Sequence, residues 1–86
     1  MEKTLNDLRG EIDRWDRALI EAFCARMEVS REIGAYKKER GLPVLDAARE
    51  EALLKKVEAL GGEHGGEVRE LYAVILRLSK AAQEKL

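Results

Sequence analysis

The chain has 86 residues, a formal net charge of −1 at pH 7 and a single cysteine, Cys24. This length allows one domain, residues 1–86, and the lone thiol excludes an internal disulfide and suits a reducing compartment such as the cytoplasm. The balanced charge argues against nucleic-acid binding, and the lack of long apolar stretches argues against a membrane span or a secretory signal.

The first predicted element is a very long helix over roughly residues 5–40. Thr4 precedes Asp7 by three residues, close to a capping pattern, and the Gly-Leu-Pro segment 41–43 predicts where the helix ends. Its apolar side chains recur at spacings of three and four, which is typical of one helix face. They are Leu5, Leu8, Ile12, Trp15, Leu19, Phe23 and Ile33.

Two shorter helices are predicted to follow. Asp46 is expected to cap the second helix, and Glu50 lies in the first turn, where the helix dipole favours an acidic side chain. The glycine-rich segment 61–66 is expected to be a flexible loop, and the third helix is expected from about Glu67 to Lys85. No stretch alternates as a strand does, so the predicted fold is all-α, with three helices.

The predicted length of the first helix argues for a dimer. About 36 helical residues extend for about 54 Å, whereas a compact monomer of this size has a diameter near 30 Å. The other two helices are each too short to cover the first, so about half of its apolar stripe would face water. We therefore expect an intertwined homodimeric helical bundle, in which the long helices of two copies pack against each other.

Polar residues occupy positions where core residues are expected. Arg26 and Lys37 are eleven residues apart on the first helix, about three turns plus 20°, so they point the same way. Ser79 and Gln83 interrupt the apolar stripe of the third helix in the same manner. These residues could lie partly exposed at a dimer edge or pair with nearby glutamates. Taken together, they instead describe a small polar pocket for an anionic ligand, because unpaired buried charge is costly.

Arg9 stands apart from this group. It lies 17 residues before Arg26, about 100° short of five full turns and about 25 Å away, so the two cannot hold one small molecule within a single chain. In an antiparallel dimer, Arg9 of one chain could reach the pocket of the other.

One face of the second helix carries Asp46, Arg49 and Glu50. This spacing is also typical of a simple N-cap with an ion pair.

Other motifs indicate no metal or phosphate-loop chemistry. His64 has no second histidine or cysteine at ligand spacing, so no metal site is expected. Segment 61–66 follows a helix and lacks the Lys-Ser/Thr ending of a phosphate loop. Cys24 has no neighbouring histidine to activate it and is expected in the core.

Five segments, taken in order, form a recognisable pattern: residues 8–13, 25–29, 33–37 and 43–50, and then Ser79 with Gln83. The series Arg…Arg…Gly-x-x-Lys…Pro-x-x-Asp-x-x-Arg-Glu resembles the all-α class, type II, of chorismate mutases. The resemblance covers nearly the full chain, and its departures are modest, such as Trp15 where a smaller aliphatic residue is common. It implies an intertwined dimer with two equivalent active sites, no cofactor, and the rearrangement of chorismate to prephenate on the route to phenylalanine and tyrosine.

The resemblance also implies how the substrate carboxylates are held. Arg26 and the Arg9 of a second copy would grip them, since arginine suits planar bidentate contacts. Ser79 and the backbone near Asp46 would bind a carboxylate at the start of the second helix, where N–H groups point outward. Arg49 would support this region.

The remaining roles implied by the resemblance concern the bridging ether oxygen and the ring hydroxyl. Lys37 and Gln83 would donate hydrogen bonds to the ether oxygen, where negative charge develops as the C–O bond breaks. Glu50 would accept a hydrogen bond from the ring hydroxyl. The catalytic residues of this reading are therefore Lys37, Gln83 and Arg26.

Three alternatives remain open from the sequence. An isochorismate pyruvate lyase shares this fold and pocket, and its substrate differs only in the position of a hydroxyl group. A non-catalytic helical domain could bind an aromatic-pathway metabolite or regulate a partner enzyme. A plain dimerisation domain would have no reason to keep Arg26, Lys37, Ser79 and Gln83 on inward faces.

Overall fold

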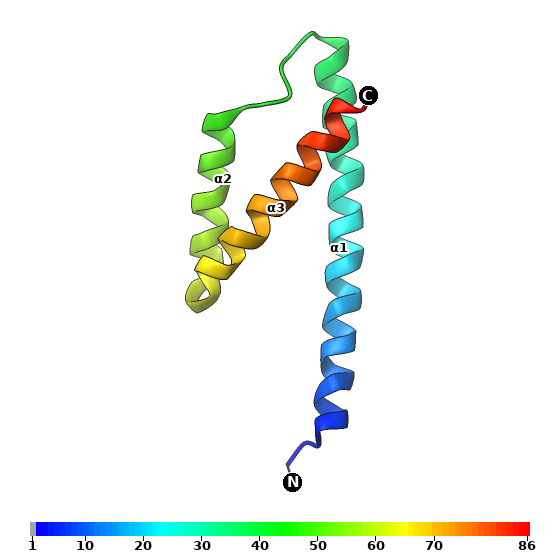
Figure 1. Ribbon diagram of the computed structural model, residues 1–86, viewed down its shortest axis with the longest axis vertical. Helices are drawn as coiled ribbons and strands as arrows, with labels where there is room; N and C mark the ends of the chain where they lie inside the picture. Colours follow the sequence, from blue (N-terminus) through cyan, green and yellow to red (C-terminus); the bar gives the residue numbers. More distant parts are fainter. Residues whose placement is uncertain (1) are drawn as a thin grey trace.

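The computed structural model describes residues 2–86 and consists of helices (Figure 1). They are the long helix α1 (Leu5–Glu39), α2 (Ala47–Leu60), the single 3₁₀ turn η1 (Gly62–His64) and α3 (Gly65–Glu84). No strand occurs within residues 2–86, so the all-α prediction with one very long first helix is confirmed. In the same part of the chain, no helix combines the length and apolar character that crossing a bilayer requires.

Helix α1 begins and ends where its sequence predicts. At its start, Thr4 Oγ1 accepts a hydrogen bond from the Asp7 N–H at 3.1 Å, and Asp7 Oδ2 accepts one from the Thr4 N–H at 2.9 Å, which completes a capping box. At its end, Gly41 adopts a positive φ of 66°, and the Leu42 N–H reaches back to the Lys37 carbonyl at 2.8 Å. This is the long bond of a Schellman motif, which glycine permits because it has no Cβ.

The glycine-rich segment 61–66 is not the flexible loop that its composition predicted. It contains η1, and α3 begins at Gly65, two residues before the predicted start at Glu67. The reason is the close approach of α2 and α3: a Cβ on Gly65 would collide with the backbone carbonyl of Glu58. Gly62 makes the turn with a φ of 57°. These glycines therefore serve a tight helix–helix corner rather than a mobile link.

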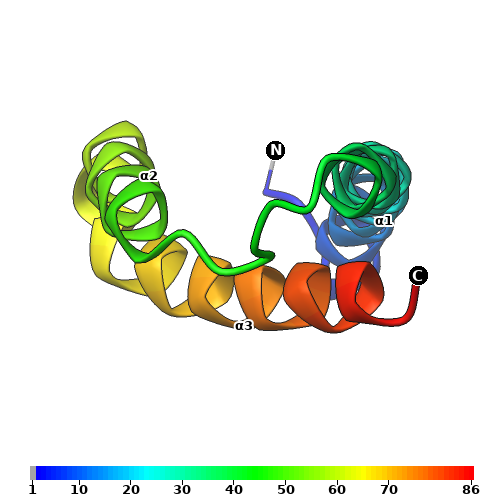
Figure 2. The same ribbon diagram turned by 90° about the horizontal axis from the view of Figure 1, so that it is seen from above.

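The three helices do not form a closed bundle. Helix α3 packs against α2 and against the C-terminal half of α1, which lie over its two ends and on the same face of it (Figures 1 and 2). Viewed along α1, the three form a U that is open on the side away from α3 (Figure 2). The radius of gyration is 16.5 Å, against about 12 Å for a compact chain of this length. Half of α1 thus extends without any packing partner in its own chain (Figure 1).

The core of a single chain is correspondingly thin. Its buried apolar residues are Val57, Ile75 and Leu76, and no large side chain within residues 2–86 is fully buried. The apolar stripe along the first half of α1 is exposed, and Trp15 is 72% exposed. Cys24 is exposed as well, so the expectation that it lies in the core is wrong for the single chain, because it lies on a face of α1 that α3 does not cover.

Candidate active site

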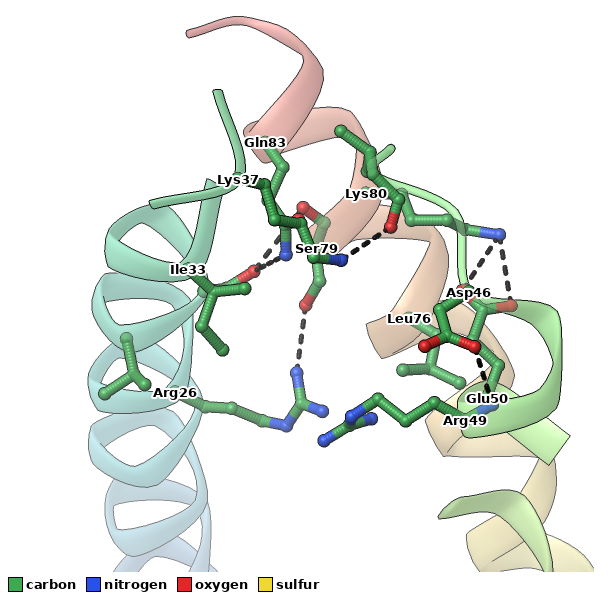
Figure 3. Close-up of a pocket in the computed structure, with 13 residues that line it drawn as sticks. Arg26, Ile33, Lys37, Asp46, Arg49, Glu50, Leu76, Ser79, Lys80 and Gln83 are labelled. Carbon is green, nitrogen blue, oxygen red and sulfur yellow. Dashed lines mark hydrogen bonds and ion pairs between the residues drawn. The ribbon is translucent and has the colours of Figure 1, made fainter. Parts of the chain in front are cut away.

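A pocket of about 260 Å³ lies where the C-terminal half of α1, the start of α2 and the C-terminal half of α3 face one another (Figure 3). Residues from all three helices and from the 40–46 connection line it. Seven of the eight residues that the sequence singled out are among them, and Arg9 is the exception. The seven are Arg26, Lys37, Asp46, Arg49, Glu50, Ser79 and Gln83.

Arg26 crosses from α1 toward α3. Its Nη1 donates a hydrogen bond to Ser79 Oγ at 2.9 Å, and its guanidinium lies 5.7 Å from the centroid of the Tyr72 ring. Both contacts are to neutral groups, and Arg26 makes no ion pair within residues 2–86. Its positive charge is held in place by the hydroxyl and the ring face, and it remains available to an anion.

Lys37 lies at the opposite end of the pocket. Its Nζ donates a hydrogen bond to the Val44 carbonyl at 2.8 Å, which ties the end of α1 to the segment that leads into α2. Lys37 has no carboxylate partner within residues 2–86. The alternative that Arg26 and Lys37 simply pair with nearby glutamates is therefore not what the described structure contains.

The start of α2 supplies three residues with different tasks. Asp46 caps the helix, since its Oδ1 accepts a hydrogen bond from the Arg49 N–H at 3.1 Å. The Arg49 side chain makes no ion pair in the described residues and points into the pocket toward Arg26 (Figure 3). Glu50 pairs across to α3, with its Oε1 3.2 Å from Lys80 Nζ. The predicted cap is present, whereas the ordinary ion pair of Asp46 with Arg49 is not.

Gln83 reaches the pocket from α3 and is held by α1. Its Nε2 donates a hydrogen bond to Ser30 Oγ at 3.0 Å, and the Ser30 hydroxyl lies 3.5 Å from the Ser79 carbonyl oxygen. The other end of the amide, Gln83 Oε1, is buried without a hydrogen-bond partner in the described chain. The sequence pattern assigned Ser30 no role.

Lys80 lines the pocket and was not singled out from the sequence. It follows Ser79 directly, and its partner Glu50 is 30 residues away on another helix, so no local spacing signals the pair. With Lys80 included, four cationic and two acidic side chains line the pocket. Glu50 pairs with Lys80, and Arg26, Lys37 and Arg49 form no ion pair within the described residues. Four positive and two negative side chains leave the lining with a formal charge of +2. Such a pocket favours an anion with more than one charge.

Arg9 is exposed on the unpacked half of α1 and does not line the pocket of its own chain, as helix geometry predicted. No group of three or more His, Cys, Asp or Glu side chains within residues 2–86 is arranged to hold a metal ion. The pocket instead contains fixed hydrogen-bond donors of three kinds, namely guanidinium, ammonium and amide.

Comparison with known proteins gives one family and several curated relatives. The family described as chorismate mutase type II matches residues 8–84. The chain is 39% identical over 75 residues to the T-protein of Haemophilus influenzae, covering 87% of this chain and 20% of that protein. It is 35% identical over 77 residues to the intracellular chorismate mutase of Mycolicibacterium smegmatis, covering 88% of this chain and 70% of that protein.

A more distant match is the chorismate mutase of Methanocaldococcus jannaschii, 22% identical over 88 residues, with 99% of this chain and 89% of that protein covered. The chain spans about a fifth of the length of several curated relatives that it matches, such as T-protein. No solved structure gives a significant match.

Proposed function

Because the chain belongs to the chorismate mutase type II family, we propose that it is an isomerase that rearranges chorismate to prephenate, as one domain spanning residues 1–86. The observation that carries the proposal is the pocket itself. Seven residues of the family pattern, spread over 58 positions of the chain from 26 to 83, line one cavity, and three of its cations form no ion pair within the described residues. A cytoplasmic location is part of the proposal and is supported by the lone thiol and by a relative named as intracellular.

The chemistry of the rearrangement suits fixed charges better than titrating groups. Chorismate is a dianion with a bridging ether oxygen, and the C–O bond breaks ahead of C–C bond formation, so negative charge grows on that oxygen. No proton needs to be transferred. A pocket accelerates such a step by holding the reactive conformer and by placing donors where charge develops. Rigid donors on three packed helices are able to do both.

In this proposal, the carboxylates of chorismate bind to the guanidinium side of the pocket. Arg26, fixed by Ser79 and by the ring of Tyr72, offers its remaining N–H groups to one carboxylate. Arg49 points toward Arg26 and adds positive charge beside it (Figure 3). Ser79 and the backbone N–H groups of the first turn of α2, after Asp46, bind a carboxylate at the positive end of the α2 dipole.

Lys37 and Gln83 are proposed to donate hydrogen bonds to the ether oxygen of chorismate. Lys37 Nζ has three N–H groups, one of which donates to the Val44 carbonyl. Gln83 Nε2 has two N–H groups, one of which donates to Ser30 Oγ. Each therefore keeps a donor for the substrate. Glu50, held by Lys80, is proposed to accept a hydrogen bond from the ring hydroxyl, since a carboxylate paired with one ammonium retains free lone pairs.

A homodimer completes the proposed site. The exposed apolar face of α1 is too large to remain in water, and a second copy of the chain would cover it. An antiparallel arrangement would bring the Arg9 of the partner chain toward the pocket, where it would grip the second carboxylate. Analytical ultracentrifugation at micromolar concentration should give a dimer, and a stable folded monomer would contradict this arrangement.

The deciding experiment is incubation of the purified protein with chorismate and, separately, with isochorismate. We expect loss of chorismate absorbance and no salicylate fluorescence from isochorismate. Salicylate formation as the main activity would identify a lyase instead. Saturable chorismate binding without turnover would identify a non-catalytic metabolite-binding domain, and neither binding nor turnover would leave only a dimerisation domain.

A further inference from the structure

We infer that Ser30 and Gly34 of α1 are positioning residues that clamp the Gln83 side chain, so that one amide N–H is presented to the pocket. The inference deepens the proposed function and rests on it, since it concerns a proposed donor to the ether oxygen. Ser30 and Gly34 are four residues apart and lie on the same face of α1, against α3. Neither contacts substrate in this scheme, and both act through Gln83.

Gly34 determines how closely the stem of Gln83 can approach α1. It is buried, and a Cβ added to it would lie 2.9 Å from Gln83 Cγ and 3.0 Å from Gln83 Cβ. These separations are too short for carbon atoms, so any larger residue at position 34 would displace Gln83. The same Cβ would also lie 2.8 Å from Leu86 Cδ1, at the end of the chain.

Ser30 determines which end of the amide faces α1. Its side chain is almost fully buried, with 4% of the residue exposed, and its hydroxyl lies 3.5 Å from the Ser79 carbonyl. A hydroxyl has one hydrogen, and when this is directed at a carbonyl its lone pairs face the remaining neighbour. That neighbour is Gln83, at 3.0 Å, so the amide must turn its NH₂ group toward Ser30.

This orientation of the Gln83 amide costs free energy, and the hydrogen bond to Ser30 offsets that cost. Gln83 Oε1 is buried without a partner within residues 2–86, and an unpaired buried oxygen favours any rotation that would expose it. The hydrogen bond to Ser30 is the only one that the Gln83 side chain makes in the described chain. Without it, the amide would be free to rotate, and its donor would no longer be held in place.

The test is a double-mutant cycle on the full chain. Ser30→Ala should lower kcat about 3- to 10-fold, the range expected for one neutral hydrogen bond, while KM changes less than about 2-fold. In a Gln83→Ala background the same Ser30→Ala change should alter kcat less than about 1.5-fold, because its only route of action is gone. Ser30→Ala keeps helix propensity, so the variant should fold.

Each outcome of this cycle bears on the inference. An equal loss of kcat in both backgrounds would mean that Ser30 acts on the fold rather than through Gln83, and no loss in the wild-type background would also overturn the inference. A wild-type protein that turns over chorismate while Ser30→Ala is unaffected overturns only this inference. A wild-type protein without turnover overturns the proposed function as well.

Gly34→Ala provides a second, independent test, with Gly66→Ala as its control. A Cβ on Gly66 of α3 would meet no atom within 4 Å, so the two changes have the same chemistry but different surroundings. Gly34→Ala should lower kcat at least about tenfold, since small displacements of an aligned group are costly, and Gly66→Ala should lower it less than about twofold. Full kcat in Gly34→Ala would overturn the role of Gly34.

Discussion

Arg26 and Lys37 are held in this pocket by neutral partners, which leaves their charge for a ligand. Arg26 is fixed by a hydroxyl and a ring, and Lys37 by a backbone carbonyl. A carboxylate partner would hold each cation more strongly, but it would also cancel the charge that an anionic substrate needs. We infer that stability is given up here for binding, as is common at functional sites.

Lys37 is the residue on which we expect the largest single effect. Lys37→Ala should lower kcat at least about 100-fold, which is typical for the loss of one donor to a developing oxyanion. Lys38→Ala is the matched control, because Lys38 is the next residue on α1 but its Nζ is directed at the exposed Leu86 carbonyl, outside the pocket. Steady-state kinetics on both variants decide the matter, and a loss under tenfold in Lys37→Ala would contradict the assignment.

The pH dependence should follow from Gln83 being a neutral donor. An amide does not titrate between neutral and alkaline pH, so kcat should stay level from pH 7 to mildly alkaline pH. A Gln83→Glu variant should instead lose activity as the pH rises, because a carboxyl group donates a hydrogen bond only while it is protonated. Both pH–rate profiles can be recorded in one buffer series. A sharp acidic optimum in the wild-type protein would mean that Gln83 does not contact the ether oxygen.

At the scale of the elements, helix ends and glycines decide how the pocket is framed. The Asp46 cap starts α2 at the pocket, and the Schellman motif at Gly41 stops α1 just beyond Lys37. The corner between α2 and α3 depends on Gly65, which allows the two helices to meet closely. The two helix ends are local in sequence, and they lie beside Asp46 and Lys37 of the pocket.

Neighbouring glycines at the α2–α3 corner should respond in opposite ways to the same change. Gly65→Ala should lower the free energy of unfolding by about 2 kcal/mol, because the added Cβ collides with the Glu58 carbonyl. Gly66→Ala should raise it by about 0.5–1 kcal/mol, because the position is helical and open and alanine is the better helix former. Urea denaturation of both variants tests this, and a similar change in both would contradict the close approach.

The capping box of α1 should be visible in a titration. The Thr4 backbone N–H, and secondarily its hydroxyl, lower the pKa of the Asp7 carboxyl from its ordinary value. A lowered pKa in the folded state means that the box stabilises α1 above the ordinary Asp value of about 3.9, and that this stabilisation is lost as the pH falls through the lowered pKa. In Thr4→Ala, NMR titration should show the pKa of Asp7 rising part of the way toward its ordinary value. An unchanged pKa would contradict the presence of the capping box.

At the scale of the whole molecule, one chain is an incomplete structure. Its long axis is 59 Å, its core is thin, and the first half of α1 exposes apolar residues that include Trp15. Arg9 lies on this exposed half, far from the pocket of its own chain. A second copy would cover the apolar face and bring an arginine to the pocket, so folding and catalysis would depend on the same association.

Mixed dimers test whether sites are shared between chains. Arg9→Ala and Arg26→Ala homodimers should each be at least about 100-fold less active than the wild type, since each site lacks one carboxylate clamp. After mixing, unfolding and refolding together, heterodimers should regain one intact site, so activity should rise toward about a quarter of the wild-type level. Activity that stays at the level of the parent variants would mean that Arg9 does not act across the dimer.

Features that depend on neighbouring residues in the chain could be predicted from the sequence. Apolar spacing predicted three helices, Thr4 and Asp46 predicted the caps, and helix periodicity predicted that Arg26 and Lys37 share a face while Arg9 does not. These predictions hold because hydrogen bonds over three or four residues and a rotation of 100° per residue are local properties. The apolar stripe of the third helix likewise predicted that Ser79 and Gln83 face inward, and the family resemblance added their expected roles.

Contacts between segments that are distant in sequence could not be predicted in this way and are visible only in the folded chain. The pairing of Glu50 with Lys80 and of Ser30 with Gln83 spans 30 and 53 residues, and no spacing rule predicts either. The helical character of segment 61–66 likewise depends on α2 packing against α3, which overrides the preference of glycine for loops. The physical reason is the same in each case: the reach of a side chain and the closeness of two backbones exist only once the helices have packed.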